Sequence, residues 1–242
     1  MCHSDDSRPP APPIAGEVAS AGPVELTSAD GTRFRAFQAT PATPNGRAMI
    51  VLPDIRGLHP YYEELATRFA EAGFHAVAID YFGRTAGLGD RGDDFDWQQH
   101  VPKVVPADVV EDARAALSLL RESTDGPVFT VGYCFGGSHS WRLAASDLDI
   151  AGAIGFYGRP SMVEDVLADL RRPLLMLIAG ADQVTSAADF DALEARLTAL
   201  DKEHEMRTYE GAPHSFFDRG FAEWADACAD AWERMLAFTG VA

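Results

Sequence analysis

A cysteine flanked by glycines is the part of this sequence best suited to chemistry. The stretch VGYCFGG places Gly132 and Gly136 two residues before and after Cys134. Glycine at both positions leaves room for a tight bend between a strand and a helix. The amino end of the following helix stabilises negative charge and so favours the thiolate, the reactive form of cysteine. The pattern predicts a thiol nucleophile at Cys134, against the alternative of a glycine-rich turn without chemistry.

A thiol nucleophile needs a base within hydrogen-bond reach, and the sequence offers seven histidines. His214, in EGAPHSFF, follows the last predicted strand and is the predicted base. His59 is the only competitor near predicted strand ends, in a loop beside Pro60. The weaker candidates are His3, His75, His100, His139 and His204.

The base in turn needs an acid that orients it. Hydrolytic sites on parallel sheets often run nucleophile, acid, base along the chain, and Asp182 lies between Cys134 and His214. It follows the apolar run LLMLIA, although it could also be a turn residue ahead of the next helix. Glu210 and Asp218 are alternatives, but both are close to His214 along the chain. Asp182 is therefore the predicted orienting acid.

Acyl transfer also requires donors for the negative oxygen of the tetrahedral intermediate. The backbone N–H of Phe135, directly after Cys134, is one expected donor. The backbone N–H of Ile55, in the loop after the strand AMIVL, is the other.

Short apolar runs that alternate with amphipathic helices predict how these residues are held. Continuously apolar strands separated by helices indicate a mostly parallel sheet covered on both faces, with ligands at the carboxyl ends of the strands. A hairpin of 24–27 and 32–39, with Asp30-Gly31 at its tip, adds an antiparallel edge. The further predicted strands are 48–52, 74–80, 127–131, 150–156, 174–179 and 205–209, and the predicted helices are 61–73, 107–122, 136–145, 163–170, 186–200 and 221–238.

The length of 242 residues suits a single α/β domain, predicted to span residues 23–242. Residues 1–22 are rich in Pro, Ser and Asp and predict an extended or flexible arm. Cys2 lies in this arm, and Cys228 recurs at helical spacing with aromatic residues, which predicts a buried core thiol. An odd count of three cysteines argues against a disulfide framework.

Charge excludes several classes of partner. The net charge of −17 disfavours nucleic acid and anionic membrane surfaces, which need clusters of Lys and Arg. No apolar run is long enough to span a bilayer, and the first residues lack the apolar core of a secretory signal, so we expect a cytoplasmic protein. An anionic substrate would have to be held by a few local arginines.

The chain resembles the dienelactone hydrolase family (carboxymethylenebutenolidases) of the α/β-hydrolase fold, from about Val24 to the C-terminus. The resemblance is carried by LPDIRGLHPYYEELATRFAEAGF, AIDYFGRTAG, VGYCFGG, the Asp of GADQ, and GAPHSFF. It implies that Cys134 forms a thioacyl enzyme, that His214 is the base and that Asp182 orients it. It also implies hydrolysis of an enol-lactone such as 4-carboxymethylenebut-2-en-4-olide to maleylacetate, without a metal or organic cofactor.

The same resemblance implies that arginines hold the substrate carboxylate. Arg84 matches one of them, whereas Arg219 falls one residue later than expected. Tyr133, beside the nucleophile, is a further predicted substrate contact. Arg56 and Arg159 are loop arginines at strand ends that could substitute.

Asp54 is the main departure from the family pattern, which usually has a glutamate here. In the family this carboxylate engages the resting thiol and takes its proton when substrate binds. A nearby carboxylate disfavours a second negative charge and so protects a thiol from oxidation. Because Asp54 is one methylene shorter, hydrolysis of an ester or lactone is a firmer expectation than the dienelactone itself.

Two other functions stay open at this point: a carboxylesterase of the same mechanism, and a non-catalytic protein that binds small molecules on this fold. The expected partner is a small ester or lactone, with or without a carboxylate, and the expected assembly is a monomer or a small homo-oligomer.

Overall fold

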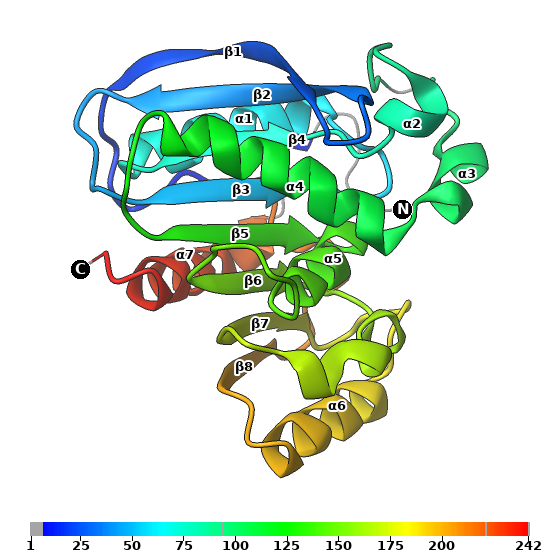
Figure 1. Cartoon of the computed structure of the whole chain (residues 1–242). Coiled ribbons are helices and arrows are strands. Elements are labelled where there is room, and N and C mark those ends of the chain that lie inside the picture. The colour runs from blue at the N-terminus through cyan, green and yellow to red at the C-terminus, as the bar shows by residue number, and fades with distance from the viewer. Residues whose placement is uncertain (1–6, 93, 221, 242) are drawn as a thin grey trace.

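The computed structural model describes residues 7–92, 94–220 and 222–241, and its centre is one eight-stranded sheet (Figure 1). The order across the sheet is β1-β2-β4-β3-β5-β6-β7-β8. All neighbours from β4 onward pair in parallel, while β1 and β2 form an antiparallel edge. The strands are β1 (Val18–Thr27), β2 (Arg33–Pro41), β3 (Ala48–Leu52), β4 (His75–Ile79), β5 (Val128–Tyr133), β6 (Gly152–Phe156), β7 (Leu174–Ala179) and β8 (His204–Tyr209).

Helices cover both faces of the sheet (Figure 1). The α-helices are α1 (Pro60–Glu71), α2 (Gly83–Ala86), α3 (Trp97–His100), α4 (Pro106–Arg121), α5 (Phe135–Leu143), α6 (Ala187–Ala199) and α7 (Ala225–Phe238). Short 3-10 turns are η1 (Val101–Lys103), η2 (Pro160–Met162), η3 (Glu164–Asp169) and η4 (Ala222–Trp224). Apolar residues of α1 and α7 share one core cluster with the central strands, and α4 packs in a second cluster on the opposite face. The mostly parallel, doubly covered sheet predicted from the sequence is therefore confirmed.

The central strands are buried along their whole length, which explains their continuous apolar character. Every residue of β3, β4, β5, β6 and β7 is buried. A strand between two helical layers has no solvent face, so polar alternation disappears. Within the described part of the chain, no helix is long and apolar enough to cross a membrane.

The first strand begins earlier than predicted. β1 starts at Val18 rather than Val24, so residues 18–22, which the sequence assigned to the arm, belong to the sheet. Gly22 and Pro23 interrupt the apolar pattern, yet Pro23 is paired opposite Phe37. Proline is tolerated here because β1 is an edge strand with one side unpaired.

Residues 7–17 of the predicted arm form no helix or strand and pack onto the domain. Gly16 N donates to Glu71 O at 2.8 Å, and Trp232 Nε1 donates to Pro10 O at 3.1 Å. Cys2 and His3, also predicted to lie in the arm, fall outside the described residues.

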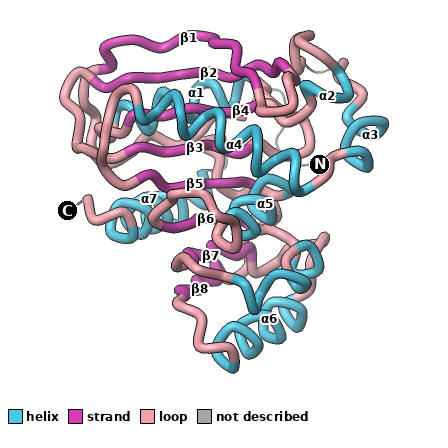
Figure 2. The backbone as a smooth tube through the Cα atoms, in the orientation of Figure 1, coloured by secondary structure: helices cyan, strands magenta, loops and turns pink. Residues whose placement is uncertain are grey.

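The connection from β4 to α4 contains small elements that the sequence did not reveal. Figure 2 shows it as loop with the short helices α2 and α3. Arg91 anchors it, since Arg91 Nη2 lies 2.8 Å from Asp80 Oδ2 and both residues are almost fully buried. The ion pair between Asp80 and Arg91, eleven residues apart, leaves no periodic pattern in the sequence. For this reason the sequence did not predict α2 and α3.

Candidate active site

Cys134 lies in a strained bend between β5 and α5. Its backbone φ of 55° and ψ of −113° are uncommon for a residue other than glycine. A Cβ at Gly132 would lie 1.9 Å from Gly136 O, and one at Gly136 would lie 2.1 Å from Pro53 O. The bend predicted from the two glycines is present, and no larger side chain fits at either position.

The surroundings of Cys134 fix its backbone at the carboxyl edge of the sheet. Its N–H donates to Phe156 O at 3.0 Å, which ties it to the end of β6, and its carbonyl accepts from Ser138 N at 3.2 Å. The residue is only 5% exposed. The sulfur therefore sits at the start of α5, where helix polarity favours negative charge.

His214 and Asp182 are hydrogen-bonded to each other. His214 Nδ1 and Asp182 Oδ2 are 2.8 Å apart, and the Asp182 side chain is 1% exposed. Val184 N donates to the other carboxylate oxygen at 2.7 Å, which fixes the orientation of the acid. A carboxylate at Nδ1 assigns the hydrogen to that nitrogen and leaves Nε2 with the lone pair that a general base requires.

Tyr157 connects this pair to the nucleophile bend. Its ring centroid lies 4.7 Å from that of His214, and it directly follows Phe156, whose carbonyl accepts from Cys134 N. The residues predicted to form the nucleophile, acid and base thus all lie at the carboxyl ends of β5, β7 and β8, with β6 between them.

The competing residues have other contacts. His59 is the N-cap of α1, where its Nδ1 accepts from Tyr61 N at 3.2 Å. Asp218 accepts from Arg8 N at 3.1 Å and from Gly220 N at 2.9 Å. Asp182, and neither of the alternative acids, is the carboxylate bonded to His214 Nδ1.

Asp54 is completely buried and paired with Arg56. Arg56 N donates to Asp54 Oδ1 at 2.8 Å, and Arg56 Nη2 lies 3.2 Å from Asp54 Oδ2. Tyr81 donates its hydroxyl to the carbonyls of Pro53 and Asp54. These contacts fix the loop that carries Ile55, and Gly136 of α5 touches the same loop.

Both arginines predicted to contact substrate have acidic partners within the protein. Arg84 donates to Asp112 at 2.7 Å and to Asp30 at 3.0 Å, beside α4. Arg219 is half exposed, 3.8 Å from Glu64 of α1. The charge and exposure of these arginines were visible in the sequence, but their acidic partners come from distant segments.

Tyr133 is fully buried, and its ring stacks on that of Phe156 at 4.6 Å. Because burial raises the pKa of Tyr133 well above its usual value, its hydroxyl stays neutral. Its side chain is part of the core cluster that also contains Cys134, and its role as a substrate contact stays a prediction.

Arg159 was considered only as a substitute arginine, yet it borders a cavity near the His214–Asp182 pair. Its N–H donates to Ser138 Oγ of α5 at 2.7 Å. The cavity has a volume of about 380 Å³, and its walls also include Val184, Thr185, Asp189 and Arg196.

No group of three or more His, Cys, Asp or Glu residues suited to a metal ion occurs within residues 7–92, 94–220 and 222–241.

His139 gives the protein a defined pH dependence of stability. It is 2% exposed, its ring lies 4.5 Å from that of Phe135, and burial, with a smaller effect of Arg142, lowers its pKa from 6.5 to about 3. Between pH 6.5 and pH 3, the His139 imidazole is therefore protonated in the unfolded chain and neutral in the folded protein. We expect this residue alone to make the free energy of unfolding about 2 kcal/mol smaller at pH 5 than at pH 8.

Urea unfolding of the parent protein and of His139→Phe at both pH values measures this effect. The loss of stability between pH 8 and pH 5 should be about 2 kcal/mol smaller in the variant. An equal loss in both proteins would show that His139 is protonated in the folded state.

Comparison with known proteins identifies the family of the chain. The model of the dienelactone hydrolase family matches residues 34–241. The carboxymethylenebutenolidase of Rhodococcus opacus is 27% identical, over 98% of this chain and 96% of the relative. A Saccharolobus solfataricus protein provisionally named a carboxymethylenebutenolidase is also 27% identical, over 86% of this chain and 94% of its own.

Among solved structures, a Klebsiella pneumoniae protein provisionally named a dienelactone hydrolase superposes with a TM-score of 0.79. It is 26% identical, and the match covers 91% of this chain and 99% of the other. With the family match over most of its length, the chain belongs to the dienelactone hydrolase family, ester and lactone hydrolases of the α/β-hydrolase fold.

Proposed function

We propose that the chain hydrolyses an enol-lactone or another activated ester through a thioacyl intermediate on Cys134. The observation that carries the proposal is the hydrogen bond of 2.8 Å between Asp182 and His214, at the same edge of the sheet as the strained bend at Cys134. A base oriented by a buried carboxylate near a nucleophile is the arrangement that covalent catalysis requires.

In the first half-reaction, His214 Nε2 takes the thiol proton and the sulfur attacks the carbonyl carbon. The resulting oxyanion accepts from the N–H groups of Phe135 and Ile55. When the intermediate collapses, the carbon–oxygen bond of the ester breaks and the imidazolium gives its proton to the departing enolate. Asp182 stabilises the imidazolium in between.

In the second half-reaction, His214 takes a proton from water, which attacks the thioester. The second tetrahedral intermediate expels the sulfur, and the carboxylic product leaves with the resting thiol restored. An enolate is a good leaving group, so a cysteine suffices for such lactones and discriminates against amides. Asp54 enters the proposal as the carboxylate that engages the resting thiol.

The carboxylate specificity implied by the relatives' names has weaker support than the reaction itself. The guanidinium of Arg84 is already bound by Asp112 and Asp30. A carboxylesterase of the same mechanism, acting on uncharged esters, is therefore the second candidate. Steady-state rates on a dienelactone and on aryl acetates distinguish the two, because only the first requires a carboxylate site.

Mixing the protein with an activated aryl acetate should add one acetyl group, which peptide mass spectrometry should assign to Cys134. The Cys228→Ala variant is the matched control: this second thiol is buried, its pKa is raised by burial to about 11, and its loss should leave the adduct intact. The Asp182→Asn variant should acylate about 100-fold or more slowly, since its imidazole loses the orienting charge.

Absence of any adduct on Cys134 with both aryl acetates and dienelactones would favour the third possibility, a non-catalytic binding protein. A retained fast acylation in Asp182→Asn would instead show that another group orients His214.

A further inference from the structure

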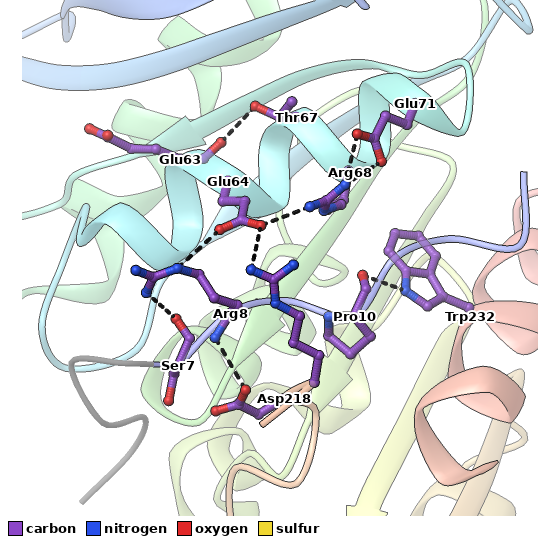
Figure 3. A network of polar contacts seen from close by, with 11 residues as sticks. Ser7, Arg8, Pro10, Glu63, Glu64, Thr67, Arg68, Glu71, Asp218 and Trp232 are labelled. Atoms are coloured by element: carbon purple, nitrogen blue, oxygen red, sulfur yellow. Dashed lines mark hydrogen bonds and ion pairs between the residues drawn. The ribbon is translucent and has the colours of Figure 1, made fainter. Parts of the chain in front are cut away.

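The N-terminal arm, defined as residues 7–17, contacts the loop that carries His214 through its main chain. Arg8 N donates to Asp218 Oδ1 at 3.1 Å, and Arg219 N donates to Arg8 O at 3.0 Å. Figure 3 shows Arg8 between Asp218 and the acidic side chain of Glu64 on α1. The main chain of Arg8 is therefore bonded to the side chain of Asp218 and to the backbone of Arg219.

The arm is fixed at further points along its length. Trp232 of α7 donates to Pro10 O at 3.1 Å, and Gly16 N donates to Glu71 O at the end of α1. Ser7 is 2% exposed, and Pro10 is also buried. The arm therefore contacts both α1 and α7.

The loop itself, residues 210–220, is strained near the base. Ser215, next to His214, has a φ of 65°, a conformation that costs about 1–3 kcal/mol unless its surroundings enforce it. Tyr61 of α1 donates its hydroxyl to Phe217 O, and Asp218 N donates to Phe216 O at 2.8 Å. Asp218 is 3% exposed and accepts from both Arg8 N and Gly220 N, so it joins the loop to the arm.

The ion pairs around Glu64 contribute less than these backbone contacts. Arg8 Nε and Arg219 Nη2 lie 3.6 Å and 3.8 Å from the Glu64 carboxylate, and both arginine side chains are about half exposed. Such exposed pairs contribute about 0–1 kcal/mol each. The argument rests on the main chain of Arg8 and the buried carboxylate of Asp218.

We propose that the arm is part of the active-site support, and that Asp218 is a positioning residue. Through the main chain of Arg8, the carboxylate of Asp218 holds the loop in the conformation that directs the His214 imidazole to Asp182. This inference rests on the proposed role of His214 as the base. The arm lies outside residues 34–241, the span of the family match, whereas Asp218 lies within it.

The test compares two substitutions of one residue. Arg8→Pro removes the N–H that Asp218 accepts, whereas Arg8→Ala keeps it and removes only the half-exposed side chain. Residue 8 precedes Pro9, which already biases its backbone toward the extended conformations that proline itself adopts. On an activated ester we expect Arg8→Pro to lower kcat about tenfold with KM within twofold, and Arg8→Ala to stay within twofold of the parent in both.

Two further measurements would stay unchanged in the variants if Asp218 and the arm only stabilised the fold. In Arg8→Pro the acid limb of the kcat/KM profile should shift to lower pH, because a displaced imidazolium is stabilised less by Asp182. The proton NMR signal of His214 Nδ1–H, identified by its loss in His214→Gln, should broaden or move in Arg8→Pro and stay in place in Arg8→Ala. This signal is independent of turnover, so it tests the positioning even if the parent hydrolyses no ester.

Asp218→Ala provides the same test if Arg8→Pro does not fold, and Asp218→Asn, which keeps an acceptor oxygen, should recover most of the activity. A folded Arg8→Pro or Asp218→Ala protein with parental kcat, pH profile and His214 signal would overturn the proposal. If the parent protein hydrolyses no ester but its His214 signal still changes in Arg8→Pro, the proposed function is rejected and the positioning role is retained.

Discussion

Alanine in place of Cys134 should lower kcat/KM for an activated ester by about 10⁴-fold or more, because no other group is placed to attack the carbonyl. The Asp182–His214 pair and the backbone donors would remain, so the residual rate should stay above that of the ester in buffer. The fold should be unaffected, since alanine tolerates the φ of 55° no worse than cysteine does. Steady-state kinetics with a melting curve of each protein measures both effects.

Two companion variants identify the roles more closely. His214→Ala should still acylate slowly but release product more slowly still, so the thioester should accumulate in the mass spectrum. Cys134→Ser tests why sulfur is present: an equal or better rate on an enol-lactone would remove the proposed advantage of a thiolate. Hydrolysis of the ester by Cys134→Ala at the parental rate would reject the thioacyl mechanism.

Gly136→Ala should destabilise the protein by about 3 kcal/mol or more and should also abolish turnover. The added Cβ would lie 2.1 Å from Pro53 O and 2.2 Å from Leu52 O, so α5 and the loop after β3 must separate. That separation would move the Phe135 and Ile55 donors apart. Urea unfolding gives the first effect, and the acylation rate of Cys134 gives the second.

Gly22→Ala is the matched control for this substitution. Gly22 lies in β1 with nothing within 4 Å of an added Cβ. Its stability and activity should therefore stay within about 0.5 kcal/mol and twofold of the parent, as for other open surface positions. A Gly136→Ala protein as stable and active as Gly22→Ala would show that the bend can open without consequence.

The central sheet could be predicted because its strands are buried on both faces. The runs AMIVL and LLMLIA match β3 and β7 at both ends, and helix signals such as the capping box of Ser186 and Asp189 place α6. The fold class and the family follow from such local patterns. The packing of the arm and the start of β1 at Val18 could not be predicted, because Gly22 and Pro23 interrupt the strand pattern and the pairing depends on distant residues.

The candidate site divides in the same way. The order of Cys134, Asp182 and His214 follows from strand ends, and their catalytic roles stay predictions. The substrate contacts of Arg84 and Tyr133 also stay predictions, and the protein partners of these two residues could not be predicted from the sequence. Asp112 binds Arg84 from α4, and Phe156 covers Tyr133 from β6, so tertiary neighbours decide what each side chain can reach.

The two ends of the chain differ in what can be attached to them. Near the C-terminus, Gly240 O accepts a hydrogen bond from Arg47, which precedes β3 and so lies at the amino ends of the parallel strands, away from the candidate site. Near the N-terminus, Arg8 donates to Asp218, four residues from His214. Figure 1 shows the C-terminus at the amino ends of the strands. An affinity tag for purification or immobilisation therefore belongs after α7, on the side of the sheet away from the candidate site.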